Sequence, residues 1–136
     1  MRTFTRYKDL AYEVIGAAME VHRTLGSGLL EAVYSEALHI ELCNRGVDNA
    51  IEVEVPCYYK GQRMEKSYRM DMVVGDICVE MKAVTELSSQ HRAQLFNYLR
   101  ITHHTAGILL NFGNPNHLIS ERYIYDEHTD SYVFVK

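Results

Sequence analysis

Two carboxylates and a lysine lie close together in the sequence, on either side of a short turn. Asp71 precedes the turn Gly75-Asp76, and Glu80 and Lys82 follow it. A glycine followed by any residue is a favoured two-residue hairpin loop, and this loop length sets Asp71 opposite Glu80 on one face. Lys82 shares that face because it is two residues from Glu80. Like charges placed directly opposite destabilise a sheet, so a bound divalent cation is the simplest reason for the pair. The spacing therefore predicts metal-assisted hydrolysis of a phosphodiester bond.

The expected cation is Mg²⁺ or Mn²⁺, because carboxylate oxygens favour hard cations and Mg²⁺ keeps several waters, one of which could attack phosphorus. Lys82 would orient that water or stabilise the charge that develops on the phosphate, or it could instead serve as the general base. Arg69 lies two residues before Asp71, and the same register sets it opposite Lys82, where it could contact a substrate backbone. The alternative interpretation is that Glu80 forms a surface ion network with Lys82 or Arg69.

The composition is that of an ordinary globular protein. The chain has 136 residues, of which 47% are hydrophobic and 24% charged, so residues 1–136 are expected to form one domain. No apolar run reaches the roughly 18 residues of a membrane span. The three cysteines form no close motif, and we therefore expect a cytoplasmic protein with free thiols and no membrane partner.

The charge does not by itself indicate a nucleic-acid partner. The formal net charge is −4, whereas nucleic-acid binders usually carry a basic footprint. Bound divalent ions would offset this charge, which weakens the objection. Basic residues do recur along the chain, although a solvated surface is their ordinary interpretation. They are Lys60, Arg63, Lys66, Arg92 and Arg100.

The apolar pattern changes from helical spacing to alternation and predicts an α/β domain in which helices pack on a central mixed sheet, in the order ααβββαβββ. On the second helix, an apolar face of Leu30, Val33, Ala37 and Ile40 is expected to pack on the core. The first strand alternates as a half-buried strand does, and Pro56 favours an edge position or a bulge for it. The predicted helices cover residues 5–24, 29–45 and 88–103, and the predicted strands cover 51–60, 65–74, 77–84, 105–112, 118–125 and 132–135.

The segment from Gly28 to Tyr34, Gly-Leu-Leu-Glu-Ala-Val-Tyr, matches the pattern G-x-x-E-x-x-Y and resembles the GxxExxY proteins, a family assigned to the PD-(D/E)XK nuclease superfamily. This resemblance covers most of the chain and implies a restriction-endonuclease-like core. It also implies that Asp71 is the strand aspartate and that Glu80 and Lys82 form the E-x-K pair. The residue before Asp71 is methionine rather than the proline of the superfamily name.

The resemblance implies roles for further residues. Glu31 corresponds to a helix glutamate that helps to bind metal, although an exposed glutamate at a helix start is the alternative. Gln94 corresponds to a helix glutamine that could hydrogen-bond a metal-bound water or a phosphate, although a solvated side chain is nearly as plausible. Tyr98 lies one turn later on the same helix face, where it could contact substrate. The main-chain carbonyl of Met81 is expected to face the metal site.

The expected activity is hydrolysis of nucleic acid, with DNA as the expected substrate and Mg²⁺ or Mn²⁺ as cofactor. One such site per chain cuts one strand, so cleavage of a duplex would require a homodimer or two events. The rival hypothesis is a catalytically inactive module that retains the fold and binds nucleic acid or protein. The acidic isoelectric point, about 5.9, favours the rival.

Overall fold

The computed structural model describes residues 4–135, and within them the predicted order of elements is confirmed. No helix in this range is long and apolar enough to cross a membrane. The elements are α1 (Phe4–Leu25), α2 (Glu31–Asn44), β1 (Ala50–Tyr59), β2 (Gln62–Val74), β3 (Ile77–Lys82), α3 (Ser89–Thr102), β4 (Ala106–Asn111), β5 (Ile119–Asp126) and β6 (Ser131–Val135).

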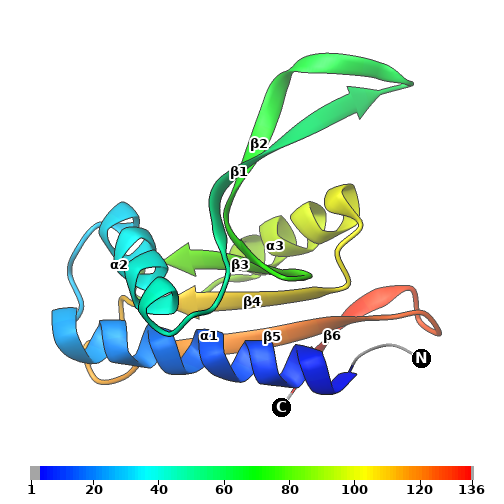
Figure 1. Ribbon diagram of the computed structural model, residues 1–136. Helices are drawn as coiled ribbons and strands as arrows, with labels where there is room; N and C mark the ends of the chain where they lie inside the picture. The colour runs from blue at the N-terminus through cyan, green and yellow to red at the C-terminus, as the bar shows by residue number, and fades with distance from the viewer. Residues whose placement is uncertain (1–3, 136) are drawn as a thin grey trace.

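The six strands form one sheet in the order β1-β2-β3-β4-β5-β6. β3 and β4 are parallel, and every other neighbouring pair is antiparallel. The parallel pair requires a crossover, and α3 supplies it. Helices α1 and α2 cover one face of the sheet, and α3 covers the other (Figure 1). The predicted α/β class with a central mixed sheet is therefore confirmed.

Strand alternation divides β3 between the two faces. Ile77, Val79 and Met81 belong to the large apolar cluster that includes α1 and α2. Cys78 belongs to the smaller cluster on the α3 face. Glu80 is two residues from Cys78 and shares its face, so a buried carboxylate lies under α3.

The predicted apolar face of α2 is wrong except at Ala37, which packs against the core. Leu30 is 75% exposed and Ile40 is 52% exposed, whereas Tyr34, Leu38 and Leu42 are fully buried. The helix has apolar residues on two sides, so periodicity did not distinguish them. The buried side is the one that carries the tyrosine, whose ring stacks on Phe112 of the sheet region with centroids 4.5 Å apart.

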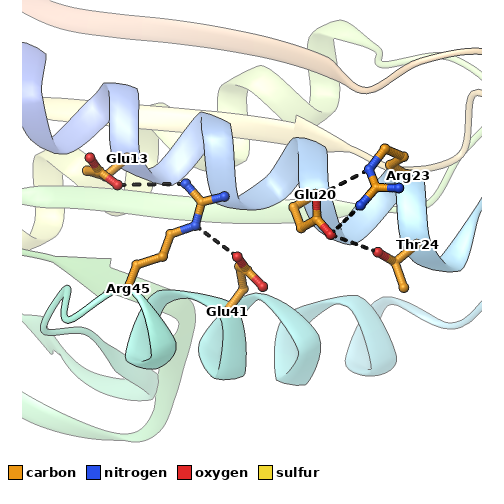
Figure 2. Close-up of polar contacts among 6 residues, drawn as sticks. All are labelled: Glu13, Glu20, Arg23, Thr24, Glu41 and Arg45. Carbon is orange, nitrogen blue, oxygen red and sulfur yellow. Dashed lines mark hydrogen bonds and ion pairs between the residues drawn. The ribbon is translucent and has the colours of Figure 1, made fainter.

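An ion pair links the two helices of this face at their solvent edge. Arg45, which follows α2, donates to Glu41 at 2.9 Å and lies 3.8 Å from Glu13 of α1, as Figure 2 shows. A second pair within α1 joins Arg23 to Glu20. These groups are partly or largely exposed to solvent, so each pair contributes little to stability compared with the apolar contacts beneath them.

The distal part of the β1–β2 hairpin, residues 56–69, rises clear of the sheet on the side where α3 lies (Figure 1); we call it the arm. Pro56 lies on an edge strand and beside a register shift, as predicted. The predicted alternation of β1 is confirmed only in the middle of the strand: Val55 is buried and Val53 and Cys57 are half-buried, whereas Ile51 and Tyr59 are exposed. The arm has no second layer over most of its length, so the alternating pattern of the sequence does not translate into burial there.

Candidate metal and phosphate site

The hairpin register predicted from the two-residue turn is confirmed where the ladder forms. Val74 pairs with Ile77, and Met72 pairs with Val79. Gly75 has φ +58°, a left-handed conformation that favours glycine at this turn. The next two positions along the hairpin are Asp71 and Glu80, and the turn therefore sets the two carboxylates beside each other.

Each carboxylate of the pair accepts a hydrogen bond from the backbone of the other strand. The Asp71 N–H donates to Glu80 Oε2 at 2.9 Å, and the Met81 N–H donates to Asp71 Oδ2 at 2.9 Å. These bonds lie where β2 leaves β3, since the backbone ladder ends at Met72 and Val79. Glu52, next to Asp71 across the β1–β2 ladder, has φ +50°, so the backbone is irregular at this point. The side chains thus take over hydrogen bonds at the position where the strands separate.

The surroundings of the pair oppose negative charge. Burial raises the pKa of Glu80 to about 8, and repulsion from Asp71 adds to this effect. Burial likewise raises the pKa of Asp71, against the opposing effects of the Met81 N–H and Lys82. The nearby charge of Glu31 raises the pKa of both groups. Two adjacent carboxylates with raised pKa values favour the uptake of a positive ion or a proton.

The available oxygen ligands fit a hard divalent cation that binds through few protein groups. Within residues 4–135, no three His, Cys, Asp or Glu side chains gather closely enough to hold a metal ion together. Mg²⁺ does not need three, because it usually binds through one or two carboxylates and keeps several waters. Asp71 and Glu80 each use one oxygen for a backbone donor, so the second oxygen of each carboxylate can serve a cation.

Lys82 lies at the end of β3 and is turned toward α3. Its Nζ donates to Gln94 Oε1 at 3.0 Å, and Gln94 Nε2 donates to the Tyr98 hydroxyl at 3.3 Å. Lys82 also lowers the pKa of Glu80, so it lies within electrostatic range of the pair. Among the ion pairs of the described residues, none joins Lys82 to Glu80. The alternative of a Glu80–Lys82 surface ion pair is therefore not supported, and the structure brings Gln94 and Tyr98 to the lysine.

Glu31 approaches the site from α2. Its Oε2 accepts a hydrogen bond from the Ala83 N–H at 3.4 Å, just beyond the end of β3. The start of α2 is held by Tyr34, whose hydroxyl donates to the Gly26 carbonyl at 2.5 Å and accepts from the Leu29 N–H at 3.2 Å. Glu31 is exposed and does not join the other carboxylates in a three-ligand cluster. Its predicted role as a direct metal ligand remains a prediction.

The predicted position of Arg69 opposite Lys82 is wrong. Arg69 pairs with Glu54 of β1, and it lies in the part of β2 that has separated from β3. Tyr68 contacts Tyr98 of α3, with ring centroids 5.4 Å apart, so the neighbouring Arg69 points to the other face of the arm. The bend of β2 at Asp71 is the physical reason, because the expected register assumes that the hairpin stays regular.

Two positioning features escaped the sequence-based prediction. Asn111 is buried, and its side chain makes hydrogen bonds with both the N–H and the carbonyl of Val84, at 3.0 and 2.9 Å. A Cβ at Gly113 would lie 2.0 Å from the Val84 carbonyl oxygen, so the two chain segments are in direct backbone contact. An asparagine that ends an apolar strand and a glycine two residues later were the available signals.

A bidentate ion pair fixes α3 to the sheet. Arg92 Nε and Nη2 donate to the two oxygens of Glu121 on β5, at 2.7 and 2.8 Å. The hydrogen bond from Arg92 lowers the pKa of the Glu121 carboxyl. This pair holds the helix that presents Gln94, and Arg92 is therefore already occupied by a carboxylate.

Comparisons with known proteins agree with this arrangement. Residues 8–123 match the sequence model of the PD-(D/E)XK nuclease superfamily. A solved structure, titled "Crystal structure of SSO0001", superposes with a TM-score of 0.57 at 19% sequence identity, and supports the restriction-endonuclease-like fold. The match covers 92% of this chain and 63% of that one, so the chain spans less than two thirds of its structural neighbour. No curated protein shows significant sequence similarity to the chain.

Proposed function

Because the chain belongs to the PD-(D/E)XK nuclease superfamily, we propose that it is a metal-dependent nuclease that hydrolyses phosphodiester bonds of nucleic acid, with DNA as its substrate. Enzymes of this superfamily generally use divalent metals and act on nucleic acid. The observation that carries the proposal is the pair of neighbouring carboxylates, Asp71 and Glu80, with Lys82 directed past them toward Gln94.

Asp71 and Glu80 would hold Mg²⁺ or Mn²⁺, with help from Glu31 and the main-chain carbonyl of Met81. When bound, the cation would activate a water and neutralise charge on the phosphate. Burial makes the two carboxylates costly to ionise in its absence, and a cation that binds both would offset this cost. The backbone hydrogen bonds hold both groups in place, which keeps the ligands organised before binding.

Lys82 would place its ammonium group beside the phosphate and stabilise the negative charge that develops there. Gln94 accepts a hydrogen bond from this ammonium group, which fixes its direction, and the Tyr98 hydroxyl in turn accepts a hydrogen bond from the Gln94 amide. Gln94 would also be able to steady the attacking water or a phosphate oxygen. The hydrogen bonds from Lys82 to Gln94 and from Gln94 to Tyr98 are already made without substrate.

We also propose that the chain is a GxxExxY protein, on the segment from Gly28 to Tyr34. The glycine has φ +99° before the helix, the glutamate reaches the end of β3, and the tyrosine fixes the loop. One site per chain would cut one strand, so cleavage of a duplex would involve a homodimer or two events.

The deciding experiment is a Mg²⁺- or Mn²⁺-dependent cleavage assay on linear, single-stranded, branched and circular substrates, with Lys82→Ala run beside the wild type. We expect cleavage by the wild type and a loss of roughly 10²–10³-fold in the variant. Activity that survives the substitution would remove the role assigned to this lysine.

The second candidate is a catalytically inactive module that binds nucleic acid or protein. The acidic isoelectric point and the lack of a three-ligand cluster within residues 4–135 favour it. Thermal unfolding in millimolar Mn²⁺ distinguishes the two. A melting temperature that rises in the wild type but not in Asp71→Asn supports a metal site, and no rise in either protein supports the inactive module.

A further inference from the structure

Positive charge is concentrated in two segments of an otherwise acidic chain. The arm, residues 56–69, carries four basic side chains and one acidic side chain, and residues 87–105, which contain α3, carry two basic side chains and no acidic one. The rest of the chain carries eight basic and 17 acidic side chains. Arg92 is already paired with Glu121, so a polyanion would be attracted mainly to the arm and to Arg100, and repelled by most of the remaining surface.

The arm and α3 enclose two neighbouring hollows. The smaller, about 270 Å³, is lined by Tyr68 of the arm and by Gln94, Asn97 and Tyr98 of α3, among others. The larger, about 740 Å³, lies between the base of the arm and the C-terminal end of α3, where Arg100 forms part of its wall. Arg100 also donates a hydrogen bond to Asn97, so one wall residue of each hollow is joined to the other along α3.

The lining chemistry matches a single strand of nucleic acid. Tyr68 is 48% exposed and rests against the buried Tyr98, so it presents an aromatic surface that is already held in place. Amide side chains without acidic neighbours surround it. Aromatic surfaces that stack on bases, combined with basic groups that follow the backbone, are the recurring means of binding single strands. The base faces of a duplex are stacked inside it and are not available to such a ring.

The smaller hollow leads to the candidate site through a continuous set of contacts. Tyr68 contacts Tyr98, the Tyr98 hydroxyl accepts from Gln94, and Gln94 accepts from Lys82. Lys66 is two residues from Tyr68 on β2, so it lies on the same face of the arm. Arg63 and Arg69 are each an odd number of residues from Tyr68, so they lie on the opposite face of the arm, away from α3.

We propose that the groove between the arm and α3 binds single-stranded nucleic acid, with Tyr68 stacked on a base and with Lys66 and Arg100 on backbone phosphates. The strand then continues past Gln94 to the carboxylate pair. This last step rests on the proposed nuclease function, whereas binding in the groove does not.

The test is fluorescence anisotropy with a labelled single-stranded DNA oligonucleotide and a blunt duplex of the same sequence, both in EDTA. We expect the wild type to bind the single strand more tightly. Tyr68→Ala should weaken this binding about tenfold without changing its salt dependence, because stacking is lost and no phosphate contact is. Tyr68→Trp should retain binding, which separates loss of stacking from a failure to fold.

The role of charge is tested by comparing Lys66→Ala with Arg63→Ala. Each variant removes one positive charge from β2, but the two residues lie on opposite faces of the arm. Lys66→Ala should lower the slope of log affinity against log salt by about 0.7, the value for one phosphate contact on a single strand, and Arg63→Ala should leave it unchanged. Equal losses in both variants, or a duplex that binds as tightly as the single strand, would overturn the proposal.

The two proposals fail in different ways. If the wild type binds the single strand but does not cleave it in Mg²⁺ or Mn²⁺, the nuclease proposal is refuted and the groove proposal stands. If the wild type cleaves, and Tyr68→Ala binds and cleaves single strands as well as the wild type does, the groove proposal is refuted and the nuclease proposal stands. Asp71→Asn should bind the oligonucleotide in EDTA as the wild type does, and should fail to cleave it in Mg²⁺ or Mn²⁺.

Discussion

The α1–α2 face and the α3 face of the sheet are built from alternate residues of the same strands, yet their chemistry differs. The first buries a continuous apolar cluster that runs from Tyr7 of α1 to Phe112 after β4. The second buries a smaller cluster, and the buried polar side chains of the strands, Glu80 and Asn111, both alternate onto it. One face supplies stability, and the other holds groups that cost stability unless they are paired with a ligand or a hydrogen-bond donor.

This division explains how a domain of this size can keep two carboxylates side by side. The free energy that the pair costs is offset by burial on the opposite side of the same strand, where Val79 and Met81 flank the position of Glu80. Substitutions on the two faces should therefore have different signatures: large losses of stability on one, and changes in pH dependence and activity on the other.

The largest effect is expected on the α1–α2 face. Leu38→Ala removes a fully buried side chain from the apolar cluster and should lower the free energy of unfolding by about 2–5 kcal/mol. Urea denaturation measures the loss, and cleavage per folded molecule should stay unchanged. A loss below about 1 kcal/mol would show that this face is less well packed than its burial indicates.

The next effect concerns Glu80 in the metal-free protein. Its pKa rises from 4.5 to about 8 in the folded state, so the folded protein binds the proton more strongly than the unfolded chain in this range. The stability of the wild type should consequently fall as pH increases from about 5 to 8.5, by roughly 2–4 kcal/mol. Glu80→Gln should remove most of this slope and be the more stable protein at pH 8.5 in EDTA. Urea denaturation at several pH values measures this dependence. If the free energy of unfolding changes with pH equally in both proteins, the pH dependence does not come from Glu80.

A smaller effect is expected from Gln94, which contacts Lys82 rather than the carboxylates. Gln94→Ala should reduce kcat/KM about tenfold, roughly 1.4 kcal/mol, because Lys82 loses the acceptor that directs it. The Mn²⁺ concentration that half-saturates the thermal shift should not change. A change in that concentration would instead assign Gln94 to the cation.

The smallest effect is expected on the outer side of α2. Ile40→Gln alters a side chain that is 52% exposed and should change the free energy of unfolding by less than about 0.5 kcal/mol. Urea denaturation beside Leu38→Ala compares the two sides of one helix. A loss comparable to that of Leu38→Ala would mean that this side is covered in solution.

The sequence predicted those features that depend on local chemistry. The Gly75 turn determined the hairpin register and with it the neighbouring carboxylates. The predicted third helix begins at Ser88, and the Ser88 side chain caps α3 by accepting a hydrogen bond from the His91 N–H. Both signals involve residues only a few positions apart, so they do not depend on how the rest of the chain packs.

The features that failed depend on distant packing. The sequence of α2 offers two apolar sides, and only the position of Phe112 in the fold decides between them. The bend of β2 at Asp71 coincides with a left-handed backbone at Glu52, a residue type that gives no signal for it. As a result, the carboxylates were placed correctly and Arg69 was not. The contact from Lys82 to Gln94 joins a strand end to a helix, and the sequence indicated the two residues without indicating their bond.

The absence of a side chain at Gly113 determines how closely the ends of β3 and β4 approach each other. Because the Val84 carbonyl occupies the space that a methyl group would need, the ends of β3 and β4 are fastened backbone to backbone. Lys82 and Asn111, which pair across these strands, must then shift together or not at all. A change in the position of the β3 end that carries Lys82 would therefore require a coordinated change in its parallel neighbour, β4.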